Sequence, residues 1–144
     1  MPMPRSVAAL PRLAVCSFAG AFSLVIAGAA LAGPADLDAT FGNNGIVLAH
    51  VGPGDSPEVI NALEIQADGR IVAAGVTEIG NGSNDQNFAL MRFMPDGSVD
   101  TGFGTNGRVI TAITSGPFWD KIEDVALQGN GKILAAGVSD ILQT

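Results

Sequence analysis

The sequence contains an internal repeat, which limits the folds that it can adopt. Residues 37–47 match residues 99–109, and residues 63–76 match residues 125–138, in one comparison without a gap at a constant offset of 62 positions. Between 37–82 and 99–144, 16 of 46 positions are identical. Such a match indicates a tandem array, in which each unit is one small structural element that packs against its neighbours.

Each unit is predicted to form four strands, because no helical periodicity of useful length is present. The strands are expected at 46–51, 60–65, 71–76 and 88–94. The first of the two hairpin strands alternates, with Asn61, Leu63 and Ile65 on one face and Ile60, Ala62 and Glu64 on the other. Residues 71–76 are apolar on both faces, which predicts a strand that is covered on both sides.

Turn signals separate these strands. Asp68-Gly69 and Asn130-Gly131 predict two-residue hairpin turns, in which both turn residues would need a positive φ. A further turn is expected at Pro95-Asp96-Gly97. The hairpin assignment implies that a valine at Gly69 or Gly131 would strain the turn.

A four-stranded unit repeated in tandem is typical of a β-propeller blade. The period exceeds the roughly 40–50 residues of the best-known propeller repeats, and the loop at 80–87 would account for the excess. The expected fold is therefore all-β: tandem four-stranded antiparallel blades of a propeller-like repeat, incomplete at about two blades, after an N-terminal signal helix.

Residues 1–32 differ from the rest of the chain and predict an export signal. Arg5 and Arg12 precede an uncharged stretch at 13–31, and Ala30-Leu31-Ala32 supplies the small residues of a cleavage site. An uncleaved membrane anchor is the alternative, since about 20 apolar residues can span a bilayer. The expected organisation is a signal peptide at 1–32, a first repeat or blade at 33–98, and a second repeat at 99–144 that ends after its third strand.

Charge and cysteine content exclude several classes of function. Of the 7 basic residues, 2 lie in the leader, so the segment 33–144 carries 5 basic and all 14 acidic groups, a net charge near −9. A basic face that reads nucleic acid is therefore disfavoured. The single cysteine, Cys16, lies in the leader, which excludes a disulfide scaffold or a cysteine-based zinc site in the remainder.

Three segments together resemble a known family. They are Leu37–Gly45, Ala67–Gly75 and Phe88–Asp100, which carry the pattern Leu-Asp-x-Thr-Phe-Gly-x-x-Gly, an Asp-Gly-Arg-Ile strand pair, and Phe-Ala-Leu-x-Arg-Phe-x-x-Asp-Gly-Ser-Val-Asp. This pattern is similar to the bacterial delta-60 repeat and covers essentially all of 36–144. The resemblance implies a propeller-like module of exported bacterial proteins. The family has no established activity, so no catalytic residue is carried over.

No catalytic, cofactor-binding or metal-ligating residue is assigned from the sequence. The lone His50 is interpreted as a partly exposed strand residue, since no second histidine or mature cysteine exists to share a zinc ion. Acidic residues beside turns are interpreted as turn residues, with calcium as the alternative ligand. They are Asp36, Asp38, Asp96 and Asp100. The segment Asn81-Gly82-Ser83-Asn84-Asp85 is a further candidate of the same kind. Trp119 replaces Pro57 of the first unit and is a candidate for stacking on a sugar or a partner's side chain.

The function expected from the sequence is an exported, non-catalytic binding or structural module at the cell surface, in the periplasm or outside the cell. Two alternatives stay open: a fragment of an extracytoplasmic propeller enzyme, a lyase or hydrolase, and a calcium-stabilised adhesion segment. The expected partners are a protein or glycan, with no nucleic acid and no stable membrane insertion after leader cleavage. Because a single blade cannot bury its own faces, further repeats or self-association are expected.

Overall fold

The computed structural model describes residues 13–15, 22–26, 36–79, 85–114 and 118–140. All regular structure in this part of the chain is β-strand, and neighbouring strands of each sheet are antiparallel, which confirms the all-β expectation. The strands are β1 (Leu13–Val15), β2 (Phe22–Ile26), β3 (Ile46–Ala49), β4 (Glu58–Ile65), β5 (Ile71–Glu78), β6 (Gln86–Phe93), β7 (Arg108–Thr111), β8 (Asp120–Leu127) and β9 (Ile133–Ser139).

A four-stranded antiparallel sheet in the order β4-β5-β6-β7 forms the centre of the molecule. This is the blade that the repeat predicts, but its fourth strand comes from the second sequence unit. The sheet therefore crosses the boundary between 33–98 and 99–144. Since β3 and β7 occupy the same repeat position, each sequence unit begins with the strand that completes the preceding sheet.

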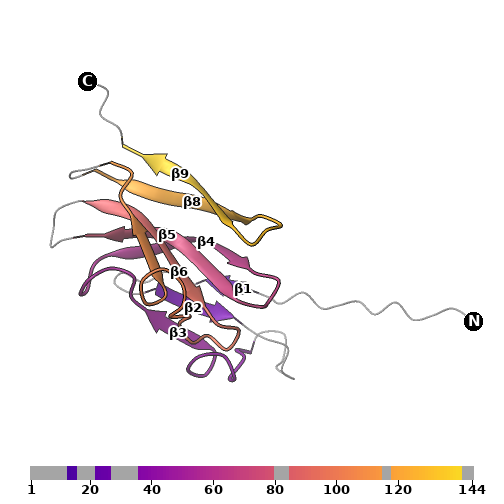
Figure 1. The fold of residues 1–144 in the computed structure, drawn as a ribbon. Helices are drawn as coiled ribbons and strands as arrows, with labels where there is room; N and C mark the ends of the chain where they lie inside the picture. Colours follow the sequence, from indigo (N-terminus) through magenta and orange to yellow (C-terminus); the bar gives the residue numbers. More distant parts are fainter. Residues whose placement is uncertain (1–12, 16–21, 27–35, 80–84, 115–117, 141–144) are drawn as a thin grey trace, which may run out of the picture.

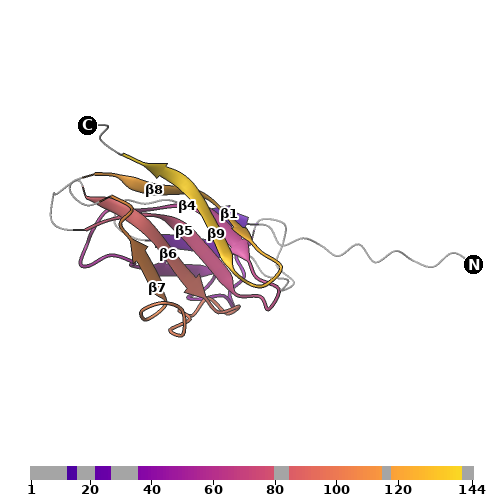
Figure 2. The same ribbon diagram turned by 45° about the horizontal axis from the view of Figure 1, so that its top comes forward.

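Two smaller sheets cover the two faces of this blade (Figures 1 and 2). On one face, β3 contributes Val47 and Ala49 to a cluster that includes Met91 and Phe93 of β6. On the other face, Ile122 of β8 packs against a cluster of β5 and β6 residues. Strand β5 is accordingly buried along nearly all its length, as its doubly apolar sequence predicted.

A β-bulge in β4 changes the predicted facing of its side chains. The pairing with β5 shifts register between Ile60 and Ala62, so that Asn61 is the extra residue. Ile60 and Leu63 consequently pack against the same cluster, whereas strict alternation placed them on opposite faces. The same shift recurs in β8, between Ile122 and Asp124. The alternation expected for 60–65 is therefore wrong at the bulge.

The bulges explain why a glycine recurs in the partner strands. Gly75 pairs with Ile60 and Gly137 with Ile122, directly beside each bulge. A Cβ at Gly75 would collide with the carbonyl oxygen of Val59, and one at Gly137 with that of Lys121. The backbones approach too closely for any side chain at these two positions.

The hairpin turns differ from the predicted two-residue type. Gly69 and Gly131 have φ values of +82° and +81°, but Asp68 and Asn130 are not among the described non-glycine residues with positive φ. In the first turn the N–H of Gly69 donates to the carbonyl of Gln66, and the N–H of Gln66 donates to the carbonyl of Arg70. This is the three-residue loop with a left-handed glycine and a bulge.

Asp68 and Asn130 stabilise these turns through their side chains, whereas the prediction gave them a positive φ. The N–H of Arg70 donates to Oδ1 of Asp68 at 3.1 Å, and the N–H of Lys132 donates to Oδ1 of Asn130 at 3.1 Å. These side chains hold the turn through a hydrogen bond two residues on, so they need no left-handed backbone.

Part of the predicted export leader is described as strand. β1 and β2 form a three-stranded sheet with β3, whose edge offers them backbone hydrogen-bonding groups. The other residues of 1–32, the expected cleavage point and most of the predicted signal helix lie outside the described residues. Within the described part of the chain, no helix is long and apolar enough to cross a membrane.

Gly69→Val and Gly131→Val should each destabilise the protein by about 1 kcal/mol or more, because a branched side chain is strained at positive φ. The measurement is thermal unfolding followed by circular dichroism. Gly129→Val is the matched control, since Gly129 has no positive φ and its Cβ would meet nothing within 4 Å. Unchanged melting of both turn variants would contradict the left-handed assignment.

Gly75→Ala should lower the free energy of unfolding by about 1–3 kcal/mol, the usual range for overpacking, because the bulged strand must move away. Chemical denaturation monitored by Trp119 fluorescence or circular dichroism provides the measurement. Gly129→Ala, which adds the same methyl group in open space, should have a much smaller effect. A Gly75→Ala variant as stable as that control would show that the close approach at the bulge is absent.

Candidate functional site

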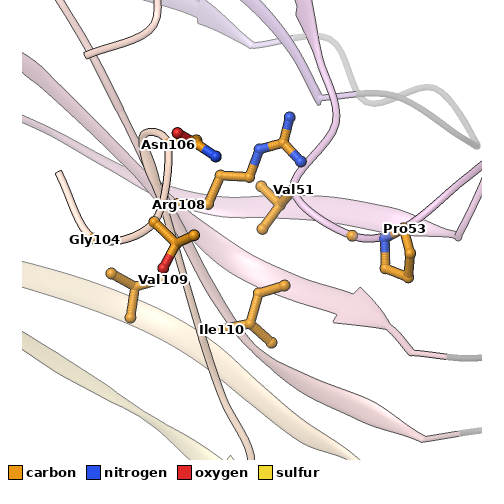
Figure 3. Close-up of a pocket in the computed structure, with 9 residues that line it drawn as sticks. Val51, Pro53, Gly104, Asn106, Arg108, Val109 and Ile110 are labelled. Carbon is orange, nitrogen blue, oxygen red and sulfur yellow. The ribbon is translucent and has the colours of Figure 1, made fainter. Parts of the chain in front are cut away.

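The candidate site is a pocket of about 630 Å³ between two loops and the start of β7 (Figure 3). One wall is Val51–Pro53, the segment that follows β3. The opposite wall is the turn Gly104–Asn106 and the β7 residues Arg108–Ile110. The pocket therefore joins residues that lie more than fifty positions apart in the sequence, one wall from each repeat.

A buried carboxylate fixes the first wall. Glu58, at the start of β4, is 3% exposed, and its Oε1 accepts the backbone N–H groups of Val51 at 2.8 Å and Gly52 at 2.5 Å. The hydroxyl of Thr77 on β5 lies 3.5 Å from the same oxygen. These hydrogen bonds satisfy two backbone donors that would otherwise be buried without a partner. Glu58 thus anchors the loop to the central sheet.

The second repeat contains the same arrangement. Asp120 is 1% exposed, and its Oδ2 accepts the N–H groups of Ile113 at 2.6 Å and Thr114 at 3.0 Å. The hydroxyl of Ser139 donates to Oδ1 at 2.5 Å. Burial raises the pKa of Asp120, but the hydrogen bonds from Ser139, Thr114 and Ile113 outweigh it, so the pKa lies below its usual value.

Neither of these carboxylates was singled out from the sequence, although a signal was present. Glu58 and Asp120 lie one repeat period apart, as do Thr77 and Ser139. An acid and a hydroxyl that recur together at the repeat period indicate a structural pair. The sequence did not show that these acids are buried, because an acidic residue at the first position of a strand is usually exposed to solvent.

His50 lies immediately after β3 and faces Glu58. Its side chain is 42% exposed, and Nδ1 lies 3.6 Å from Oε2 of Glu58. These two atoms are buried and have no hydrogen-bond partner. In the described part of the chain, no three His, Cys, Asp or Glu side chains converge on a point that would hold a metal ion.

The second wall is built by a turn that both repeats share. The N–H of Phe103 donates to the carbonyl of Asp100 at 3.0 Å, and the N–H of Gly107 donates to the carbonyl of Phe103 at 2.8 Å. Gly104 and Asn106 adopt φ values of +54° and +52°. Residues 38–45 repeat this geometry, with positive φ at the two corresponding positions.

Asp38 and Asp100, the acids that recur at the repeat period, hold these turns. Oδ1 of Asp38 accepts the N–H and the hydroxyl of Thr40 at 2.9 and 2.6 Å. Oδ1 of Asp100 accepts the N–H of Gly102 at 3.1 Å. Both acids therefore act as turn residues, as their positions in the sequence predicted, and calcium beside them stays a prediction.

Asp100 also joins two arginines, Arg70 just before β5 and Arg92 on β6. Its Oδ2 lies 2.8 Å from Nε of Arg92 and 3.1 Å from Nε of Arg70, and Arg92 stacks 4.6 Å above the ring centre of Phe103. Burial raises the pKa of Asp100, but the Gly102 N–H and the two arginines outweigh it and lower the pKa. The carboxylate therefore ties the pocket's turn to the central sheet.

The other sequence candidates lie apart from the pocket. The side chain of Asp96 accepts the N–H and the hydroxyl of Ser98 at 2.9 and 2.7 Å, and these bonds lower its pKa. Asp36 is exposed, and Trp119 is 58% exposed at the start of the second hairpin. Residues 81–84, part of the alternative calcium loop, fall outside the described residues.

Arg108 gives the pocket its charge. Its side chain is exposed and makes no ion pair with the other described residues. Asn106 adds a polar amide group beside Arg108, while Pro53 and Ile110 add apolar surface (Figure 3). Thr105 also lines the pocket. A guanidinium presents several N–H donors in a fixed plane and suits carboxylate or phosphate groups. The arrangement can hold an anion beside an apolar surface.

Asp120 should make the free energy of unfolding depend on pH in the acid range. Because the folded-state pKa is lowered, Asp120 stabilises the fold above the unfolded pKa of about 4, and this contribution is lost as the pH falls through the folded pKa. Unfolding free energies measured between pH 7 and pH 2 should fall towards acid. Asp120→Asn should be less stable at pH 7 and show a shallower fall.

Asp55→Asn is the control for this measurement, since it makes the same change at an exposed position. It should keep the stability and the pH profile of the parent protein. If Asp120→Asn and Asp55→Asn show the same dependence of unfolding free energy on pH, the stabilising role of Asp120 is refuted.

Comparison with known families identifies the central part of the fold. Residues 66–103 match the model of a domain of unknown function, DUF5122, described as a β-propeller. No curated protein and no solved structure matches the chain. The matched segment runs from the β4–β5 turn through β5 and β6 to the turn that forms the second wall of the pocket. The chain thus contains a β-propeller repeat similar to a domain whose function is unknown.

Proposed function

We propose that this chain is an exported, non-catalytic β-propeller segment that acts as a binding module through the pocket at Arg108. The observation that carries the proposal is how the two repeats differ at that pocket. The positions they share build the scaffold: the buried acid, the turn and the glycine opposite the bulge. Arg108 replaces Ile46 of the first unit, which adds a charge that the scaffold does not require.

The lining of the pocket favours binding over chemistry. Arg108 is the one ionisable residue among the lining residues that the structure describes. A guanidinium remains protonated at physiological pH, so it donates hydrogen bonds but does not accept a proton as a general base. Neither carboxylate near the pocket is among its lining residues: Oε1 of Glu58 accepts two backbone N–H groups, and Asp100 pairs with arginines.

The ligand chemistry that fits is a carboxylate attached to a body with apolar surface. Residues 33–144 carry a net negative charge, which repels anions, and Arg108 places a positive charge at the pocket. Acidic glycans and peptides with acidic side chains share this chemistry. Export is supported by the basic and then apolar leader, and by the resemblance to the delta-60 repeat of exported proteins.

Arg108→Ala should weaken binding of an acidic ligand about tenfold or more, because hydrogen bonds to charged groups contribute about 1.5–3 kcal/mol. The measurement is binding of the purified chain to an array of uronic-acid oligosaccharides and to a library of acidic peptides. The array that binds identifies which source of carboxylate is used.

Lys121→Ala is the matched control, because it removes one positive charge from β8, which does not line the pocket. It should leave affinity nearly unchanged. Equal affinity of Arg108→Ala and the parent chain would contradict the proposed site. Turnover of a bound oligosaccharide or ester would instead support the propeller enzyme.

A further inference from the structure

The buried acid of the second repeat has hydrogen-bond partners on both of its oxygens. Oδ2 of Asp120 accepts the N–H groups of Ile113 and Thr114. Its Oδ1 accepts the hydroxyls of Thr114 and Ser139. A buried carboxylate costs free energy when one of its oxygens lacks such partners. The second repeat therefore shows which contacts this position requires.

In the first repeat one oxygen of the equivalent acid has no donor. Oε1 of Glu58 accepts the N–H groups of Val51 and Gly52. The hydroxyl of Thr77 lies 3.5 Å from this same oxygen. Gly52 stands where the second repeat has Thr114, so the side-chain hydroxyl of that position is missing. Among the described residues, Oε2 of Glu58 is thus buried without a hydrogen-bond partner.

His50 places a titratable donor beside this oxygen. Its Nδ1 lies 3.6 Å from Oε2 of Glu58, and this nitrogen is also buried without a partner among the described residues. The second repeat has Ala112 at this position, where the acid needs no further donor. Histidine changes its charge between pH 5 and 8, and a charged donor makes a stronger hydrogen bond to a carboxylate than a neutral one.

The loop that Glu58 holds packs tightly enough to respond to such a bond. A Cβ at Gly52 would collide with the hydroxyl oxygen of Thr77, and Val51 is 2% exposed. Val51–Pro53 forms one wall of the pocket at Arg108. A change in how firmly Glu58 is held therefore reaches the pocket wall through two backbone N–H groups.

Other charged groups near this pair do not take the place of His50. They lie on the loops and strands beside it, while β2 and β3 contain none, and they are Asp55, Glu64, Glu78, Asp85, Arg92 and Arg108. Within the described residues, Glu58 forms an ion pair with His50 alone. The charged strand β8 packs on the other face of the central sheet. Arg108, across the pocket, repels a protonated His50, whereas Glu58 attracts it from 3.6 Å.

We propose that His50 is a pH-dependent positioning residue for this loop: when protonated, it donates from Nδ1 to Oε2 of Glu58 and gives Val51–Pro53 a second anchor. The attraction needs the proton, so it is present at about pH 5 and is lost as the pH rises to about 8. The order of this loop then depends on pH, whereas that of the equivalent loop in the second repeat does not. A firmer wall at acid pH should also favour an acidic ligand, a consequence that rests on the proposed function.

Amide hydrogen exchange followed by NMR tests the anchor without any ligand. Protection factors, which remove the intrinsic effect of pH on exchange, should rise about two- to fivefold at Val51 and Gly52 between pH 8 and pH 5, the range for partly exposed ion pairs. His50 is the only histidine of the chain, so a change in this range can be assigned to it. His50→Asn, which keeps a neutral donor, should remove the rise.

The second repeat supplies an internal control in the same molecule. The amides of Ile113 and Thr114 are held by Asp120, whose pKa is lowered and which has alanine in place of the histidine. Their protection factors should stay constant from pH 8 to pH 5. Constant protection at Val51 and Gly52 as well, or an equal rise in His50→Asn, would overturn the proposal.

Binding of a uronic-acid oligosaccharide separates this proposal from the proposed function. Its affinity for the parent chain should rise about two- to fivefold from pH 8 to pH 5, and its affinity for His50→Asn should not. If protection at Val51 rises with acid but the oligosaccharide does not bind, the anchor is supported and the proposed function fails. If both chains bind with the same pH dependence, the effect of His50 on the pocket is refuted.

Discussion

The central sheet has two apolar faces, and the arrangement of the other strands is set by the need to cover both of them. Strand β5 is buried on each side, so one neighbouring sheet must supply Val47 and its companions and another must supply Ile122. Burial of apolar surface contributes roughly 25 cal/mol per Å², and a single blade cannot obtain that from its own residues. The placement of one smaller sheet on each face of the central sheet follows from this requirement.

The buried and partly buried acids near the pocket hold loops and turns against the packed sheets. Glu58 and Asp120 each hold the loop that enters a new sheet, and Asp100 joins a turn to Arg70 and Arg92. Each satisfies backbone donors that would otherwise be buried without a partner, which costs free energy. The acids that recur in the repeats thus have structural roles, whereas Arg108 replaces an isoleucine of the first repeat and belongs to none of these contacts.

The sequence predicted the strands well because their apolar patterns and turn residues are local. It failed where two strands influence each other. The bulge at Asn61 placed Ile60 and Leu63 on one face, and the turn at Gly69 took a three-residue form with an ordinary backbone at Asp68. The sequence also did not show that Glu58 is buried or that Pro53 and Arg108 line one pocket. Both features depend on contacts between segments that are distant in the chain.

The period, the four strands of the repeat and the double burial of β5 could be predicted from residue order alone, because each has a regular pattern of apolar and turn residues. Only the packing of the sheets shows that β7 completes the sheet of the preceding unit and that Glu58 and Asp120 face inward. The reason is physical: which residues are buried depends on the sheet packed against them. Val72 and Leu134 occupy the same position of the repeat and differ in exposure only because β8 covers one of them.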